Sequence, residues 1–206
     1  MQAITDLIMY FHKGGLVMWP LLACSVTVIA IAIERFIYYK SVDSGAAFAA
    51  RYCAAVRSGD FAVATELARK GSGQCAQMLA DVAAIAGGKA EKSAFLESRA
   101  GIFMATLRDK LDYLGIIVTM SPLLGLLGTI VGMIGAFSIF NVEAGAPIAI
   151  TGGIGEALIA TATGLCVAIL SLCAHSYFAH RMDNMITDME QCFSALLEAE
   201  TRRARS

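Results

Sequence analysis

Three long apolar runs constrain this chain more than any other feature of its sequence. They cover about residues 16–33, 114–140 and 148–178, and only Glu156 and His175 interrupt the third. A helix needs about 20 apolar residues to cross a hydrocarbon core about 30 Å thick, and lipid offers no other partner for backbone N–H and C=O groups. The chain is also 57% hydrophobic, against about 45–50% in soluble domains. The runs therefore predict an all-α integral membrane protein with three transmembrane helices.

Lysine and arginine residues give the expected orientation of these spans. Apart from Lys13, every basic residue lies within residues 34–113 or in the C-terminal tail, and the connection "NVEAGAP" between the second and third runs has none. Cytoplasmic segments carry an excess of basic residues. We therefore expect a multi-pass protein with residues 34–113 and the C-terminus on the cytoplasmic side, and with the N-terminus and the hairpin on the opposite side.

These signals divide the chain into seven segments. We expect an amphipathic N-terminal segment (1–14), a first transmembrane helix (15–34), a cytoplasmic helical domain (35–113), a second transmembrane helix (114–140), a periplasmic hairpin (141–147), a third transmembrane helix (148–179) and a cytoplasmic C-terminal helix (180–206). A frayed end is the alternative for the first segment, whose apolar residues recur at helical spacing.

The cytoplasmic segments carry helical signals of their own. Ser58, Gly59 and Asp60 are cap candidates for a helix that begins after them. Residues 90–114 are predicted to form one long helix that runs directly into the second span. The third span is predicted to continue into the tail, where an apolar stripe keeps helical spacing. Helices that extend beyond the bilayer in this way predict a cytoplasmic bundle.

Composition and motifs exclude several other classes of protein. There is no basic aromatic patch and the net charge is -1, which argues against a nucleic-acid partner. None of the six cysteines forms a C-x-x-C pair, so free thiols are expected and no metal site. No nucleophile–base pair or phosphate-binding loop is visible, which argues against an enzyme and against a cofactor.

Small residues are concentrated in the second and third spans. Close backbone approach matters in lipid, where there is little hydrophobic force between helices. Two alternatives remain open: packing of a hairpin within one chain, or packing around a pore shared between subunits. The glycines concerned are Gly125, Gly128, Gly132, Gly152 and Gly164, of which Gly128 and Gly132 form a G-x-x-x-G pair.

Glu156 is the most informative single residue. It lies about nine residues inside the third span, or roughly 13 Å from its start at 1.5 Å per residue. An ionised carboxylate at the centre of a span costs about 2.5–3.5 kcal/mol even on the more lenient scale. An acid that gains and loses one proton in such a place is suited to a proton relay.

Threonines near the depth of Glu156 are candidates for the same pathway. Thr163 lies about 20° from Glu156 around the helix and Thr161 about 140° away, while Thr129 of the second span has a matching depth. A row of hydroxyls at one depth can hold water or pass a proton. The alternative for each is a hydrogen bond to a carbonyl of its own helix. At the end of the first span, Glu34 and Arg35 are expected to form a membrane-boundary pair that extends to the surface.

The segments "SPLLGLLGTIVGMIGAF" and "GGIGEALIATATGL", with "IAIERF" at the end of the first span, resemble the MotA/TolQ/ExbB proton-channel family. Glu156 places the chain nearer the ExbB and TolQ branches than flagellar MotA. The resemblance implies a homopentamer around a central pore lined by the second and third spans. Glu156 would be the pore acid, with Thr129 and Thr161 as polar ring residues. The helical positions favour Thr163 instead of Thr161, and both remain candidates.

The resemblance also implies partners and a function. The pore would hold a dimer of an ExbD- or TolR-like protein with one transmembrane helix, and a TonB- or TolA-like transducer would carry force onward. The expected function is that of a proton-channel subunit in an inner-membrane motor, which uses the proton-motive force for transport or envelope work. The alternative is a non-conducting membrane scaffold that stabilises a partner protein.

Overall fold

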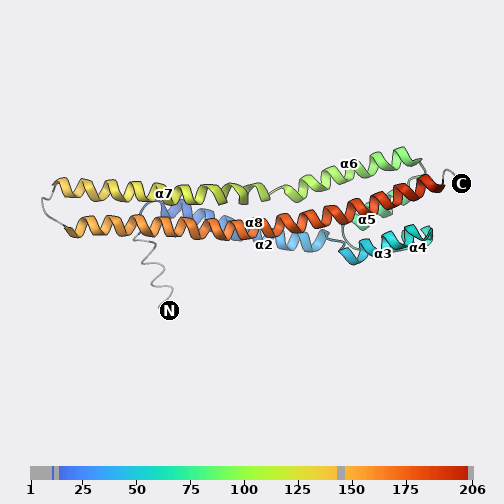
Figure 1. Ribbon diagram of the computed structural model, residues 1–206, viewed down its shortest axis with the longest axis horizontal. Coiled ribbons are helices and arrows are strands. Elements are labelled where there is room, and N and C mark those ends of the chain that lie inside the picture. The colour runs from blue at the N-terminus through green and yellow to red at the C-terminus, as the bar shows by residue number, and fades with distance from the viewer. Residues whose placement is uncertain (1–10, 12–13, 143–146, 204–206) are drawn as a thin grey trace. The chain divides into compact units, whose positions relative to one another are not determined.

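The computed structural model describes residues 11, 14–142 and 147–203, and all regular secondary structure within them is helical. The chain divides into two compact units: a span unit of Met1–Ile33 and Asp112–Ser176, and a bundle unit of Glu34–Leu111 and Tyr177–Ser206. Figure 1 shows the helices, which are α2 (Met18–Val42), α3 (Ala46–Arg57), α4 (Phe61–Lys70), α5 (Gln74–Ala83), α6 (Lys89–Arg108), α7 (Leu111–Val142) and α8 (Pro147–Arg203).

Three of these helices are long and apolar enough to cross a membrane, and each contains one of the predicted runs. The all-α prediction with three candidate spans is therefore confirmed. α8 is a single helix of 57 residues, so the expected continuation of the third span into the tail is also confirmed. The amphipathic segment predicted for residues 1–14 lies outside the described residues, except for Phe11 and Gly14, as do residues 143–146 of the predicted hairpin.

The expected continuous helix over residues 90–114 was wrong, because α6 ends at Arg108 and α7 begins at Leu111. Between them, Lys110 has a positive φ of 28°, which a helix does not accommodate. Side chains of α2 donate hydrogen bonds to the last carbonyls of α6. Arg35 Nη1 donates to the Thr106 carbonyl at 2.9 Å, and the Tyr39 hydroxyl donates to the Leu107 carbonyl at 2.9 Å. These bonds satisfy groups that a continuous helix would pair internally.

Glu34 and Arg35 form the expected ion pair, with Arg35 Nε 3.0 Å from Glu34 Oε2. The arginine does not extend to the surface, however, because it is only 3% exposed and points at the end of α6. Glu34 also lies 3.3 Å from Lys110 Nζ. The two residues therefore hold together the turn between α6 and α7 within the bundle unit.

This arrangement predicts that Arg35→Lys lowers the free energy of unfolding by about 1–2 kcal/mol. Lysine keeps the charge but lacks the planar group that reaches a carbonyl and a carboxylate at once. Thermal unfolding in detergent measures the loss. The control is Arg51→Lys, since Arg51 is exposed and bonds only the Ala47 carbonyl of its own helix at 3.1 Å. Equal melting temperatures for the two variants would contradict this role of Arg35.

The bundle unit has its own core. Asp60 caps α4 by accepting the Val63 N–H at 3.1 Å, which confirms one of the three cap candidates. Cys53, Cys75 and Cys192 are buried, and the Sγ atoms of Cys53 and Cys192 lie 3.9 Å apart. Burial raises the pKa of the Cys53 thiol to about 11. The thiol therefore stays neutral near pH 7 and packs as a small apolar group.

Candidate functional site

The site begins with the close approach of α7 and α8, which run side by side in the span unit (Figure 1). A Cβ atom at Gly164 would lie 2.6 Å from the Ser121 carbonyl oxygen and 3.0 Å from the Gly125 Cα. Both are backbone atoms, which no side-chain rotation can clear. At this point the two helices therefore approach each other as closely as glycine allows.

Other glycines extend the same contact. A Cβ at Gly132 would lie 3.0 Å from the Gly153 carbonyl oxygen and 3.3 Å from the Ala157 Cβ, and one at Gly128 would overlap the Ala160 Cβ. The structure thus matches the intrachain alternative for Gly125, Gly128, Gly132 and Gly164. Gly152 is different, because a Cβ there would meet no atom of the described residues within 4 Å. Lining of a shared pore by these helices stays a prediction.

Glu156 lies on α8 beside this contact, and its side chain reaches the segment that precedes α2. It is only partly exposed. A Cβ atom at Gly15 would overlap Glu156 Oε1 and would lie 2.8 Å from Cδ of the same carboxylate. The carboxylate therefore packs directly on the backbone of Gly15. Sequence reasoning placed Glu156 at the site but missed Gly15, although the pair Gly14-Gly15 directly before the first apolar run was an available signal.

In the described part of the chain, no lysine, arginine or histidine forms an ion pair with Glu156. This matters because a permanent cationic partner would hold the carboxylate in its charged form. Within those residues, the charge of Glu156 is thus not compensated. Proton exchange at Glu156 stays a prediction.

The three candidate threonines occupy different places. Thr161 Oγ1 lies 3.2 Å from the Gly125 carbonyl and 3.1 Å from the Ala157 carbonyl, so it sits between α7 and α8. Thr163 donates to the Ile159 carbonyl at 2.8 Å and Thr129 to the Leu126 carbonyl at 2.6 Å, each within its own helix. The hydroxyl protons are thus used by backbone carbonyls, while the oxygens can still accept a hydrogen bond.

Two serines that the sequence did not point to also lie buried in the span unit. The Ser171 hydroxyl donates to the Leu114 carbonyl at 3.0 Å and so links α8 to α7. Ser121, next to Pro122, has a fully buried hydroxyl oxygen for which the described residues offer no hydrogen-bond partner. Both serines are small residues within apolar runs. The sequence alone therefore does not distinguish them from the other small residues at the contact between the helices.

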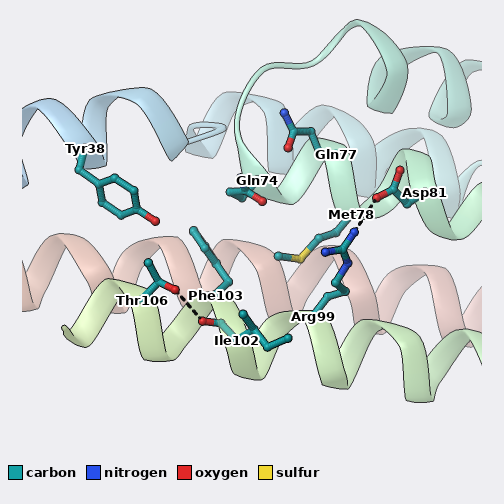
Figure 2. Close-up of a pocket in the computed structure, with 9 residues that line it drawn as sticks. All are labelled: Tyr38, Gln74, Gln77, Met78, Asp81, Arg99, Ile102, Phe103 and Thr106. Atoms are coloured by element: carbon teal, nitrogen blue, oxygen red, sulfur yellow. Dashed lines mark hydrogen bonds and ion pairs between the residues drawn. The ribbon is translucent and has the colours of Figure 1, made fainter.

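A pocket of about 330 Å³ lies in the bundle unit (Figure 2). Three of its polar side chains are engaged: Arg99 lies 3.5 Å from Asp81, and the Thr106 hydroxyl donates to the Ile102 carbonyl at 2.9 Å. The remainder of its lining is Tyr38, Gln74, Gln77, Met78 and Phe103. This lining offers no pairing of a nucleophile with a base. The candidate site therefore remains the surroundings of Glu156.

Comparison with known proteins gives a family match over this part of the chain. Residues 72–191 match the model of the MotA/TolQ/ExbB proton channel family. The matched region contains α7, Glu156 and all three candidate threonines. It therefore includes the whole hairpin on which the site is built, as well as part of the bundle unit.

Individual relatives give the same result. An ExbB-like biopolymer transport protein of Synechocystis sp. (ExbB-like 1) is 32% identical over 168 residues, which cover 79% of this chain and 66% of the relative. A second one from the same organism (ExbB-like 3) is 31% identical over 77% of this chain and 78% of its own length. The biopolymer transport protein ExbB1 of Vibrio cholerae is 27% identical over 85% of this chain and 80% of its own length. The similarity to each of these relatives thus extends over more than three quarters of this chain.

Proposed function

Because the chain belongs to the MotA/TolQ/ExbB proton channel family, a family of membrane transport components and not of enzymes, we propose that it is the proton-conducting subunit of a motor driven by the proton-motive force. The observation that carries the proposal is the position of Glu156. It lies partly buried on an apolar helix, and the described residues give it no cationic partner. Such a group is costly in a membrane unless the protein uses it.

In this proposal Glu156 carries the proton. A proton that enters from the periplasmic side neutralises the carboxylate, which removes the cost of a charge in a medium of low dielectric constant. Loss of the proton on the cytoplasmic side restores the charge. The two states differ by a full charge, so each favours a different arrangement of nearby polar groups. Thr129, Thr161 and Thr163 supply hydroxyl oxygens that accept hydrogen bonds from water or from the protonated acid.

The assembly in this proposal is a homopentamer around a central pore, in which the second and third spans surround a dimer of an ExbD- or TolR-like protein. An exposed apolar face of α7 supports further contacts, because several of its large side chains are about half exposed or more in the single chain. These are Leu123, Leu126, Ile130, Ile134 and Phe137. Neighbouring subunits and lipid would cover this face. A TonB- or TolA-like transducer would then pass the force to transport or envelope work.

Proton flux through the intact complex tests the function. The complex is purified from its native membrane through a tag on the C-terminal tail and reconstituted into vesicles that contain a pH-sensitive dye. A potassium gradient with valinomycin then supplies the driving voltage. The proposal predicts acidification well above that of empty vesicles. Flux equal to that of empty vesicles would instead support the non-conducting scaffold.

A further inference from the structure

We infer that the turn at Gly14 and Gly15, directly before α2, positions the carboxylate of Glu156. This inference rests on the proposed function, in which Glu156 carries the proton. It assigns a role in that function to a segment outside the two helices that contain the candidate residues. Glu156 is contacted from the segment that precedes α2.

The first argument is steric. Gly15 has a φ of +73°, in the left-handed region that favours glycine. Even without that requirement, a Cβ atom at this position would overlap Glu156 Oε1 and approach Cδ and Cγ to 2.8 and 3.3 Å. The carboxylate therefore occupies the space that any other residue would need. Both the conformation of the turn and the place of the carboxylate depend on glycine here.

The second argument is that the turn itself is fixed. The Gly15 carbonyl accepts the Met18 N–H at 3.2 Å, and the Gly14 N–H donates to the Phe11 carbonyl at 3.3 Å. Val17, Met18 and Leu21 form a buried cluster, against which Phe11 and Leu124 of α7 also pack. The backbone of Gly15 is thus held by contacts on both sides. A fixed backbone that abuts one face of a carboxylate restricts its rotamers and excludes water from that face.

Gly15 has two requirements: a left-handed backbone conformation, and no Cβ in the space of the carboxylate. Gly59 separates them, because it shares only the first. Gly59 has a φ of +81°, but in the part of the chain that the structure describes a Cβ there would meet nothing within 4 Å. The substitution Gly59→Ala therefore imposes the same backbone strain without any crowding. A Cβ at Gly14 would meet Met18 Cγ at 2.5 Å and Ile159 Cγ2 at 3.2 Å, so Gly14→Ala disturbs the turn itself and does not serve as a control.

The test is a double-mutant cycle on the intact complex, with proton flux as the measurement. Gly15→Ala is expected to reduce flux about tenfold or more, which corresponds to a small displacement of a reacting group. Gly59→Ala is expected to remain within about threefold of wild type. Shortening the acid by one methylene makes room for the new Cβ. In the Glu156→Asp background, Gly15→Ala should therefore cost less than about twofold.

Each result decides the inference. Unchanged flux in Gly15→Ala, or an equal loss in the Glu156 and Glu156→Asp backgrounds, would overturn it. If Glu156→Asp conducts no protons or Gly15→Ala assembles poorly, the same cycle is read from the melting temperature of the complex. Recovery in the double variant then supports the contact, and no recovery overturns it. Glu156→Gln in the unaltered Gly15 background tests the proposed function separately, so failure of one is distinguishable from failure of the other.

Discussion

Replacing Glu156 by glutamine is expected to abolish voltage-driven proton flux, with a loss of at least about a hundredfold, as for removal of an acid–base group. Glutamine has nearly the same size and shape as the neutral acid, so packing against Gly15 is preserved. It cannot release a proton. The complex should therefore assemble at wild-type yield and fail only in conduction, measured by dye acidification in reconstituted vesicles.

A matched control uses another acid of the same helix. Glu190 is exposed and lies in the bundle unit, so Glu190→Gln should leave both flux and assembly unchanged. Full proton flux in Glu156→Gln would refute a carrier role for Glu156. Loss of assembly in Glu156→Gln would point instead to a structural role of the charge.

The second large effect is expected for Gly164→Ala, which should lower the free energy of unfolding by about 3 kcal/mol. The added Cβ would lie 2.6 Å from the Ser121 carbonyl oxygen and 3.1 Å from the Gly125 nitrogen. Since both neighbours are backbone, α7 and α8 must move apart, at the upper end of the usual cost of overpacking. This exceeds the gain of about 0.5–1 kcal/mol that alanine normally brings to a helix. Unfolding by heat or denaturant in detergent measures the difference.

Gly155→Ala is the matched control on the same helix. Among the described residues, a Cβ there meets nothing within 4 Å, so alanine should bring its ordinary gain in helix stability. The two substitutions are chemically identical and are expected to have opposite signs. A Gly164→Ala variant as stable as wild type would show that the helices are not in close contact at this point.

The sequence was sufficient for the features that depend on local pattern. Apolar runs of the right length predicted the three candidate spans, and Asp60 was among the predicted caps because its effect is confined to one turn. The long apolar stripe after the third run predicted that α8 continues beyond the span. The third apolar run led to Glu156, since an acid in an apolar run is visible without any knowledge of its neighbours.

Features that depend on distant contacts were not predictable in the same way. The break at Lys110 lies in a segment with good helical pattern, and it is accompanied by bonds from Arg35, about 70 positions earlier, to the Thr106 and Leu107 carbonyls. Arg35 itself was expected at the surface, because a single arginine at the end of an apolar run gives no sign of a buried partner. The contact of Gly15 with Glu156 joins residues far apart in sequence, and only the fold brings them together.

The central claim is that Glu156 gains and loses a proton in the assembled complex, and infrared difference spectroscopy tests it most directly. Spectra of the reconstituted complex are recorded before and after a step in pH, for wild type and for Glu156→Gln. The account predicts a carboxylic acid C=O band that changes with pH in wild type and is absent from the variant. Identical difference spectra for the two proteins would contradict it, because some other group would then account for every protonation change observed.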